Sequence, residues 1–166
     1  MKAYLLSRKS VLLVVLSVWS FSAQAAFNCT VTATTGLPFG TYNPLSTTDL
    51  DVNPVIRVSC TLQSNPRPQA VSYSIALNKG STAATFNPRQ MALGAERLNY
   101  NIYTNAARTT IWGDGTSGTT AVTGTFTLNT IGGTSNRNHT MRARIPQGQD
   151  VAAGNYTDTV TITLTF

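Results

Sequence analysis

The sequence closes with Thr159-Val160-Thr161-Ile162-Thr163-Leu164-Thr165-Phe166, in which threonines and apolar residues alternate. A β-strand turns successive side chains to opposite faces, so this period of two predicts a strand with one apolar face. The apolar positions are Val160, Ile162, Leu164 and Phe166. Fully burying four such side chains stabilises a protein by roughly 6–12 kcal/mol before the loss of chain entropy is counted. We therefore expect this segment to lie deep in a core, covered by elements from elsewhere in the chain.

A leader precedes the rest of the chain. A basic start, an apolar core and an A-x-A cleavage site occupy residues 2–9, 11–19 and 23–25. A membrane anchor is the alternative, but it needs about 20 apolar residues, more than this run contains. We predict a secretion signal over residues 1–25, one exported domain over residues 26–166, and no stable insertion in a membrane.

The charge of the chain does not indicate a nucleic-acid partner. The whole sequence has a formal net charge of +6, but three of its twelve lysines and arginines fall within the leader. The other nine are scattered without a basic run, against six acidic residues, which excludes a nucleic-acid footprint. Charged residues make up only 11% of the sequence, against about 25% in ordinary globular domains, and threonine occurs 27 times. This composition favours β-sheet in an exported protein.

Two cysteines, Cys29 and Cys60, both follow the leader. An even number of cysteines in an exported chain predicts one disulfide, and both residues fall on the apolar faces of separate predicted strands. A metal site would need more ligands, and a lipidated Cys29 would need a small residue in place of Asn28. We expect the bond to close a loop of 30 intervening residues and to stabilise the fold by roughly 3–4 kcal/mol.

Alternation recurs through the rest of the chain, with no segment of helical period. Strand-like segments cover residues 27–33, 56–62, 71–77, 98–103, 122–128 and 140–145, and a short one ends at Trp112. Prolines and glycines in residues 36–45 allow an extended edge segment and a turn but no helix. Residues 82–97 lack a clear period and are interpreted as a crossing loop or one short strand around Arg89. These features predict an all-β immunoglobulin-like sandwich, with a closed barrel as the alternative.

Groups suited to catalysis, metal binding or cofactor binding are few. His139 is the only histidine in the sequence, and we interpret it as an ordinary surface residue rather than a catalytic base. The six acids are dispersed, and the closest pair, Asp49 and Asp51, is interpreted as part of a solvated turn. Residues 113–118 match the glycine pattern of a dinucleotide-binding loop, but a strand-like segment follows where a helix is required. We predict no enzyme, metal or cofactor; a secreted hydrolase using His139 is the weakest alternative.

Three aromatic residues, Tyr42, Tyr103 and Trp112, raise a different possibility. In a secreted β-sandwich such residues either contact a sugar or another surface ligand, or fill the ends of the core. No acidic or amide cluster accompanies them at a fixed spacing, which favours packing. A secreted carbohydrate- or surface-binding module is nevertheless the alternative function, and loss of glycan binding in Trp112→Ala with the fold intact would support it.

Short motifs follow one another along the exported part of the chain. They are Cys29-x-Val31-x-Ala33, Phe39-Gly40-x-Tyr42-x-Pro44-Leu45, Val58-x-Cys60, Leu98-x-Tyr100-x-Ile102-Tyr103, Ala107-Arg108, Trp112-Gly113-Asp114-Gly115 and Gly154-x-Tyr156-x-Asp158-x-Val160. In this order they resemble the spore coat protein U domain family, which includes the subunits of archaic chaperone-usher pili. The resemblance implies an incomplete immunoglobulin-like sandwich whose last strand is missing and is donated by a chaperone, and then by the next subunit.

The resemblance also implies a function and a set of partners. The chain is expected to be an exported, non-enzymatic structural subunit of a surface pilus or coat that supports adhesion and biofilm formation. It would pass through the periplasm to the cell surface with the help of a periplasmic chaperone, an outer-membrane usher and other pilus subunits. Its strand-acceptor groove would be bordered by Val160, Ile162, Leu164 and Phe166.

The chain departs from the family on the N-terminal side of Cys29. Shaft subunits of the family carry an extension there of about ten residues or more, whereas residues 26–28 alone follow the predicted cleavage site. A strand rises about 3.3 Å per residue, so residues 26–28 reach only about 10 Å. We therefore expect the chain to accept a strand without donating one, and to occupy a tip or terminal position.

Overall fold

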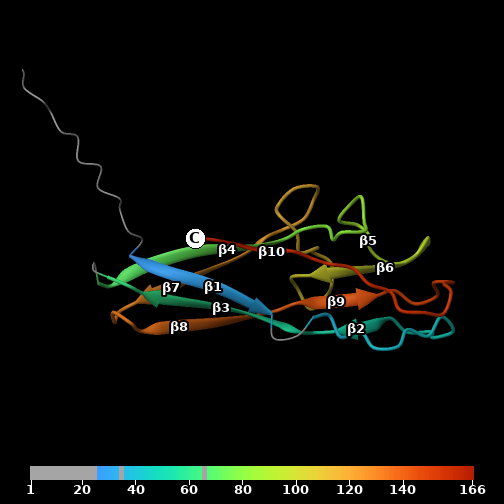
Figure 1. The fold of residues 1–166 in the computed structure, drawn as a ribbon, viewed down its shortest axis with the longest axis horizontal. Helices are drawn as coiled ribbons and strands as arrows, with labels where there is room; N and C mark the ends of the chain where they lie inside the picture. Colours follow the sequence, from blue (N-terminus) through green and yellow to red (C-terminus); the bar gives the residue numbers. More distant parts are fainter. Residues whose placement is uncertain (1–25, 34–35, 65–66) are drawn as a thin grey trace, which may run out of the picture.

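The computed structural model describes residues 26–33, 36–64 and 67–166, and the predicted secretion signal lies outside them. Within these ranges the chain forms antiparallel β-strands and no helix (Figure 1). The strands are β1 (Phe27–Ala33), β2 (Leu50–Val52), β3 (Val55–Leu62), β4 (Gln69–Leu77), β5 (Arg89–Leu93), β6 (Glu96–Tyr103), β7 (Val122–Leu128), β8 (Thr134–Thr140), β9 (Arg142–Ile145) and β10 (Ile162–Thr165).

The strands form three sheets, with the orders β1-β3-β8, β10-β4-β7 and β2-β9-β6-β5. In Figure 1 the first two sheets lie toward one end of an elongated molecule and the third lies toward the other. The first two sheets turn apolar faces toward each other and share one hydrophobic core, which makes them the two layers of a sandwich. The predicted all-β sandwich is therefore confirmed.

Alternation in the sequence becomes alternation in burial. β3 buries every second residue completely, and β4 repeats the pattern from the facing sheet; the buried residues are Ile56, Val58, Cys60, Leu62, Val71, Tyr73, Ile75 and Leu77. Between them Arg57 and Ser72 stay exposed. The inward faces predicted for these two strands are confirmed, because the period of two reports which side of the sheet meets the core.

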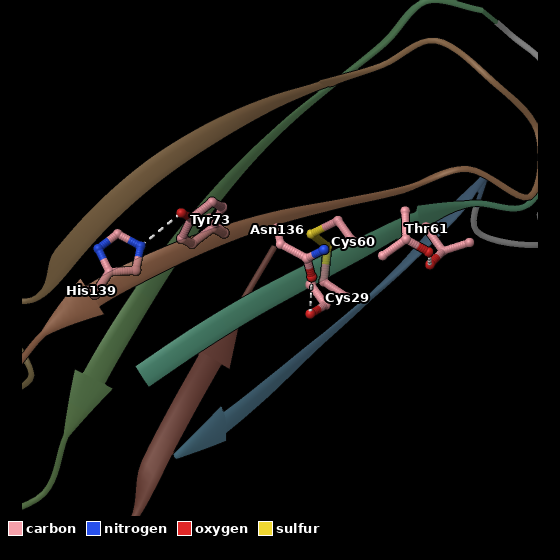
Figure 2. The surroundings of a disulfide bond; sticks show 8 residues. Cys29, Cys60, Thr61, Tyr73, Asn136 and His139 are labelled. Atoms are coloured by element: carbon pink, nitrogen blue, oxygen red, sulfur yellow. Dashed lines mark hydrogen bonds between the residues drawn. A yellow bond between two sulfur atoms is a disulfide. The ribbon is translucent and has the colours of Figure 1, made fainter. Parts of the chain in front are cut away.

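The predicted disulfide is also confirmed. Cys29 of β1 lies directly opposite Cys60 of β3, with their Cα atoms 4.1 Å apart and their sulfur atoms bonded. Both side chains are buried, and Figure 2 shows the bond spanning the two strands. The bond therefore ties the edge strand β1 to the centre of its sheet.

The strand β8 was not predicted from the sequence. Its residues Thr-Ser-Asn-Arg-Asn-His-Thr contain no aliphatic side chain, so no apolar period marks it. Cross-strand polar pairs support it instead: the Ser59 hydroxyl donates to the Asn136 side-chain oxygen over 2.6 Å, and the Thr61 and Thr134 hydroxyls lie 2.7 Å apart (Figure 2). Such pairs stabilise a sheet where burial does not.

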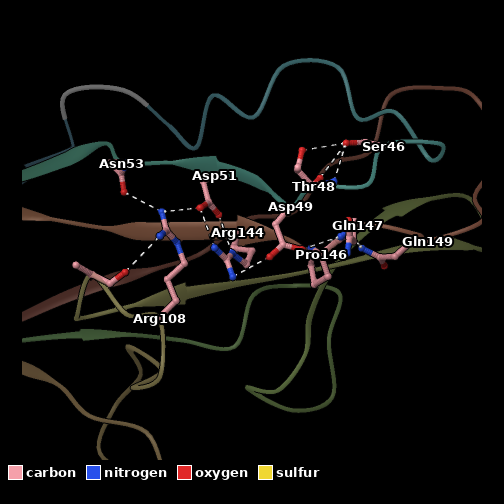
Figure 3. Close-up of polar contacts among 11 residues, drawn as sticks. Ser46, Thr48, Asp49, Asp51, Asn53, Arg108, Arg144, Pro146, Gln147 and Gln149 are labelled. Atoms are coloured by element: carbon pink, nitrogen blue, oxygen red, sulfur yellow. Dashed lines mark hydrogen bonds and ion pairs between the residues drawn. The ribbon is translucent and has the colours of Figure 1, made fainter.

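The strand β2 also corrects a prediction, because Asp51 lies on a strand rather than in a solvated turn. Arg144 of β9 donates to both Asp51 oxygens, over 2.8 and 2.9 Å, and pairs with Asp49 over 2.8 Å (Figure 3). Arg108 reaches Asp51 from the neighbouring loop, over 3.2 Å. The hydrogen bond from Arg144, aided by the charges of Arg144 and Arg108, lowers the pKa of the Asp51 carboxyl. These ion pairs attach β2 to β9.

His139 is part of the packing rather than an ordinary surface residue. Its Nε2 atom lies 2.8 Å from the Tyr73 hydroxyl, which joins β8 of one layer to β4 of the other (Figure 2). Tyr73 is buried and stacks on Phe126 with ring centroids 5.2 Å apart. Burial, together with the charge of Arg137, lowers the pKa of the histidine. This cluster joins the two layers.

Candidate strand-acceptor groove

The C-terminal segment borders two sheets in succession. Thr157 first bridges to Ala92 of β5, through a pair of main-chain hydrogen bonds of 2.9 and 3.1 Å. The chain then crosses to the other sheet, where β10 pairs with β4 from Ile162↔Leu77 to Thr165↔Ser74. β10 is the outermost strand of its sheet, so no described strand pairs with its other edge.

A groove of about 440 Å³ follows this segment. One wall is made by Ala33, Gly36, Leu37 and Phe39, the other by residues 156–160 and Ile162, and the floor comes from β4, β5, β6 and the residue before β9. The floor residues are Leu77, Met91, Tyr100, Ile102 and Met141. The groove is therefore apolar along its floor, and it lies between the end of β1 and the C-terminal segment, which belong to different sheets.

The predicted groove residues divide into two sets. Val160 and Ile162 line the groove, and with Leu164 they are half-buried against the core, while the threonines between them are exposed. The expected burial of Phe166 is wrong: its side chain is 50% exposed, and its ring lies 5.7 Å from that of Phe27 at the start of β1. Deep burial of the whole segment fails because no described strand covers the outer edge of β10.

The main-chain N–H and C=O groups of this segment have a defined orientation. The Thr161 carbonyl accepts from the Asn78 N–H over 3.1 Å, and the Thr161 N–H donates to the Asn78 side-chain oxygen over 2.9 Å. Successive residues of a strand turn their N–H and C=O groups to opposite sides. Since Thr161 faces β4, the N–H and C=O groups of Val160, Ile162 and Leu164 face the open edge. This edge can bond an added strand.

Asp158 is a charged residue in the wall of this groove, above an apolar floor. Burial opposes its ionisation, but hydrogen bonds from Tyr100, Ser81 and Thr159 outweigh that effect and lower the pKa of the Asp158 carboxyl. Burial and the hydrogen bond to Asp158 raise the pKa of Tyr100 well above its ordinary value. At neutral pH the pair is a carboxylate accepting from a neutral phenol.

A second hollow of about 480 Å³ adjoins the groove and shares Leu37, Phe39, Met91 and Tyr156 with it. Tyr42 lines this hollow, where its hydroxyl accepts from the Gln149 N–H over 2.8 Å and donates to the Pro146 carbonyl over 3.1 Å. These bonds hold residues 146–149 in place beside the hollow.

The three aromatics considered for ligand contact do not form one surface. Trp112 is fully buried and donates its indole N–H to the Ile75 carbonyl over 2.9 Å, so it is a core residue and cannot touch a surface ligand. It also lies outside a regular strand: it makes an isolated bridge to Thr120 where a strand was predicted. Tyr103 is half-buried near Arg144 and Arg108, away from the hollow that Tyr42 lines.

The part of the chain that the structure describes contains no cluster of three or more His, Cys, Asp or Glu residues that could hold a metal ion. Nor do these residues form a helix that is long and apolar enough to cross a membrane.

The sequence model of the Spore Coat Protein U domain family matches residues 15–163, which is most of the chain. The chain belongs to the Spore Coat Protein U domain family. Members of this family are structural proteins, and this Spore Coat Protein U domain is likewise not an enzyme. The resemblance drawn from the motifs is thereby confirmed.

A solved structure shares the fold of this Spore Coat Protein U domain. It is the CsuC-CsuE chaperone-tip adhesion subunit pre-assembly complex from archaic chaperone-usher Csu pili of Acinetobacter baumannii, one chain of which is 22% identical with a TM-score of 0.56. The match covers 84% of this chain and 40% of that chain, and it supports the immunoglobulin-like fold class. No curated protein sequence matches the domain.

Proposed function

We propose that this Spore Coat Protein U domain is a structural subunit of a chaperone-usher pilus, and that its groove accepts a β-strand from a partner. The observation that carries the proposal is the open edge of the C-terminal segment: Val160 and Ile162 line a groove with an apolar floor, and no described strand pairs with the outer edge of β10. An unpaired edge is a template for another strand, and half-exposed apolar side chains beside it gain free energy when that strand covers them.

The chemistry of the groove defines the donor. An extended strand entering it would bond the free main-chain groups of β10 and place every second side chain against the floor residues Met91 and Ile102. Those side chains must be apolar, while the alternate ones face water. A periplasmic chaperone would supply such a strand first, and another pilus subunit would replace it after passage through an outer-membrane usher. The protein would thus travel from the periplasm to the cell surface, where it supports adhesion and biofilm formation.

A donor peptide should stabilise the protein purified from the periplasm. The peptide has about ten residues, with valine or isoleucine alternating with threonine and lysine. Ligand at 100 times its dissociation constant adds about 2.7 kcal/mol to the free energy of unfolding, which corresponds to a rise in melting temperature on the order of 10 °C. Without the peptide we expect low stability or aggregation, because the edge and the apolar groove are exposed.

The matched control is the same peptide with serine in place of valine and isoleucine. It keeps the main-chain groups but loses the side chains that fill the groove, so it should leave the melting temperature unchanged. A monomer that melts at high temperature and responds to neither peptide would show that the sandwich needs no donated strand.

We further propose a tip or terminal position in the fibre. β1 begins at Phe27 and pairs with β3 over its whole length, so residues 27–33 already belong to the domain's own sheet and cannot be donated. A donor would have to come from residues before Phe27, where we predict a secretion signal that is removed. Such a subunit accepts a strand and ends the polymer.

Fusing an alternating donor segment ahead of Ala26 should convert the protein from a cap to a repeating subunit. In the presence of its chaperone and usher, we expect the fusion to form long polymers on gels and in electron micrographs, and the unmodified protein to form none. Long homopolymers of the unmodified protein would disprove the terminal position, though not strand acceptance.

A further inference from the structure

The residues that connect the two bordering sheets belong to no strand. We call residues 158–161 the linker; it follows the bridge between Thr157 and Ala92 and precedes β10. Val160, within the linker, forms part of the groove wall. Its position therefore depends on what holds the linker, and side chains supply most of that support.

The Asp158 carboxylate holds the first half of the linker. Its Oδ1 atom accepts from the Ser81 N–H and hydroxyl, over 2.8 and 2.9 Å, and from the Thr82 N–H over 3.2 Å. The same oxygen accepts from the Thr159 N–H over 2.8 Å. Oδ2 accepts from the Tyr100 hydroxyl over 2.7 Å. One carboxylate thus joins the linker to residues 78–82, which we call the bracing loop, and to the groove floor.

Asn78, the first residue of the bracing loop, holds the second half of the linker. Its side-chain oxygen accepts from the N–H groups of Thr161 and Gly80, over 2.9 and 3.0 Å, and its own N–H donates to the Thr161 carbonyl. Its carbonyl accepts two hydrogen bonds from the buried Arg89 guanidinium, over 2.9 and 3.1 Å. The bracing loop is therefore anchored in the core.

The bracing loop also fits closely around the carboxylate. Gly80 has a φ of 92°, a conformation that favours glycine, and a Cβ atom at this position would overlap the Asp158 carboxylate. The backbone of the loop can approach Asp158 only because this side chain is absent.

We propose that Asp158 is a positioning residue for strand acceptance. It holds the linker against the bracing loop, so that Val160 and the edge of β10 face the groove before a donor arrives. The proposal rests on the proposed function. A wall that is already ordered loses little conformational freedom on binding, whereas a loose wall must be ordered at the expense of affinity.

The test compares the affinity of the donor peptide defined above for three variants of the periplasmic protein. Asp158→Ala removes the carboxylate's bonds to Ser81, Thr82 and Tyr100, leaves those of Asn78 to Thr161, and should weaken binding by about tenfold to a hundredfold. Asp158→Asn keeps an oxygen for the Ser81, Thr82 and Thr159 donors and should restore most of the affinity. Val58→Ala opens a cavity in β3, away from the groove, and should lower stability while leaving the affinity within about twofold of the wild type.

Amide hydrogen exchange of the free variants provides a readout that does not need the peptide. Asp158→Ala should speed exchange at Thr159 and Thr161 relative to Val58→Ala of similar stability. If folded Asp158→Ala bound the peptide as tightly as the wild type, the positioning role alone would be overturned. The same would follow if Val58→Ala lost as much affinity as Asp158→Ala. A wild-type protein that binds no peptide would instead overturn the proposed function, and unchanged exchange at Thr159 and Thr161 would overturn the bracing itself.

Discussion

Replacing Arg89 by methionine is expected to lower the free energy of unfolding by about 3–5 kcal/mol. The Arg89 side chain is fully buried, and its guanidinium donates to the carbonyls of Asn78 and Trp112 and to the side-chain oxygen of Asn101. Methionine fills similar space but donates nothing, so these acceptors would lose their partners inside the core. Net stabilities of folded domains are only about 5–15 kcal/mol, so a loss of this size removes much of the total.

The guanidinium is held without an acidic hydrogen-bond partner among the described residues. Neutral oxygens surround it at 2.7–3.1 Å, and the Phe86 ring lies with its centroid 5.3 Å from the guanidinium carbon. Burial lowers the pKa of Arg89, but an arginine stays charged at any pH at which the protein is folded. The fork of donors therefore joins the start of β5 to β6 and to the loops that carry Asn78 and Trp112.

Urea unfolding measures the effect directly. Arg89→Lys should rescue little, because one ammonium group cannot reach acceptors that the planar guanidinium contacts in different directions. The control is Arg97→Met, which removes an exposed arginine on β6 and should change stability by less than about 0.5 kcal/mol. An Arg89→Met protein that unfolds at the wild-type urea concentration would contradict the role of this buried cation.

Removing the disulfide with Cys29→Ala and Cys60→Ala together should cost about 3–4 kcal/mol. The bond closes a loop with a sequence separation of 31 and fixes β1, an edge strand, to β3. Its loss gives the unfolded chain more freedom, and β1, which supplies part of the groove wall through Ala33, loses its covalent tie.

The measurement is again urea unfolding, now of the double variant and of wild-type protein with and without a reductant. The reduced wild type should unfold at nearly the same urea concentration as the double variant, since both lack the covalent link. A double variant as stable as the oxidised wild type would show that packing alone holds β1.

The sequence predicted the strands whose alternate residues are buried in the core. It missed the strands that are stabilised by polar pairs across the sheet or by ion pairs. β3, β4 and the half-buried alternation of Val160, Ile162 and Leu164 follow from the period of two. β8 carries no apolar period because hydroxyl and amide pairs across the sheet hold it. β2 is too short to show a period, and its ion pairs to β9 join residues that are far apart in the chain.

The candidate site was predictable only in part for the same reason. Val160 and Ile162 were found from their pattern, whereas Arg89 and Asn78 contribute through partners that no local signal indicates. Asp158 stood within a recognised motif, but its bonds to Ser81 and Tyr100 depend on the tertiary fold. Phe166 was misplaced because alternation reports a direction for a side chain and not whether another element covers it.

Amide hydrogen exchange, resolved by residue with and without a donor, tests strand acceptance most directly. Thr161, Thr163 and Thr165 face β4 and should exchange slowly in both states, whereas Val160, Ile162 and Leu164 face the open edge and should become protected only when the donor peptide or a partner subunit is added. Slow exchange confined to the three threonines after the donor has bound, or new protection at another edge of the fold, would contradict the assignment of this groove as the strand acceptor.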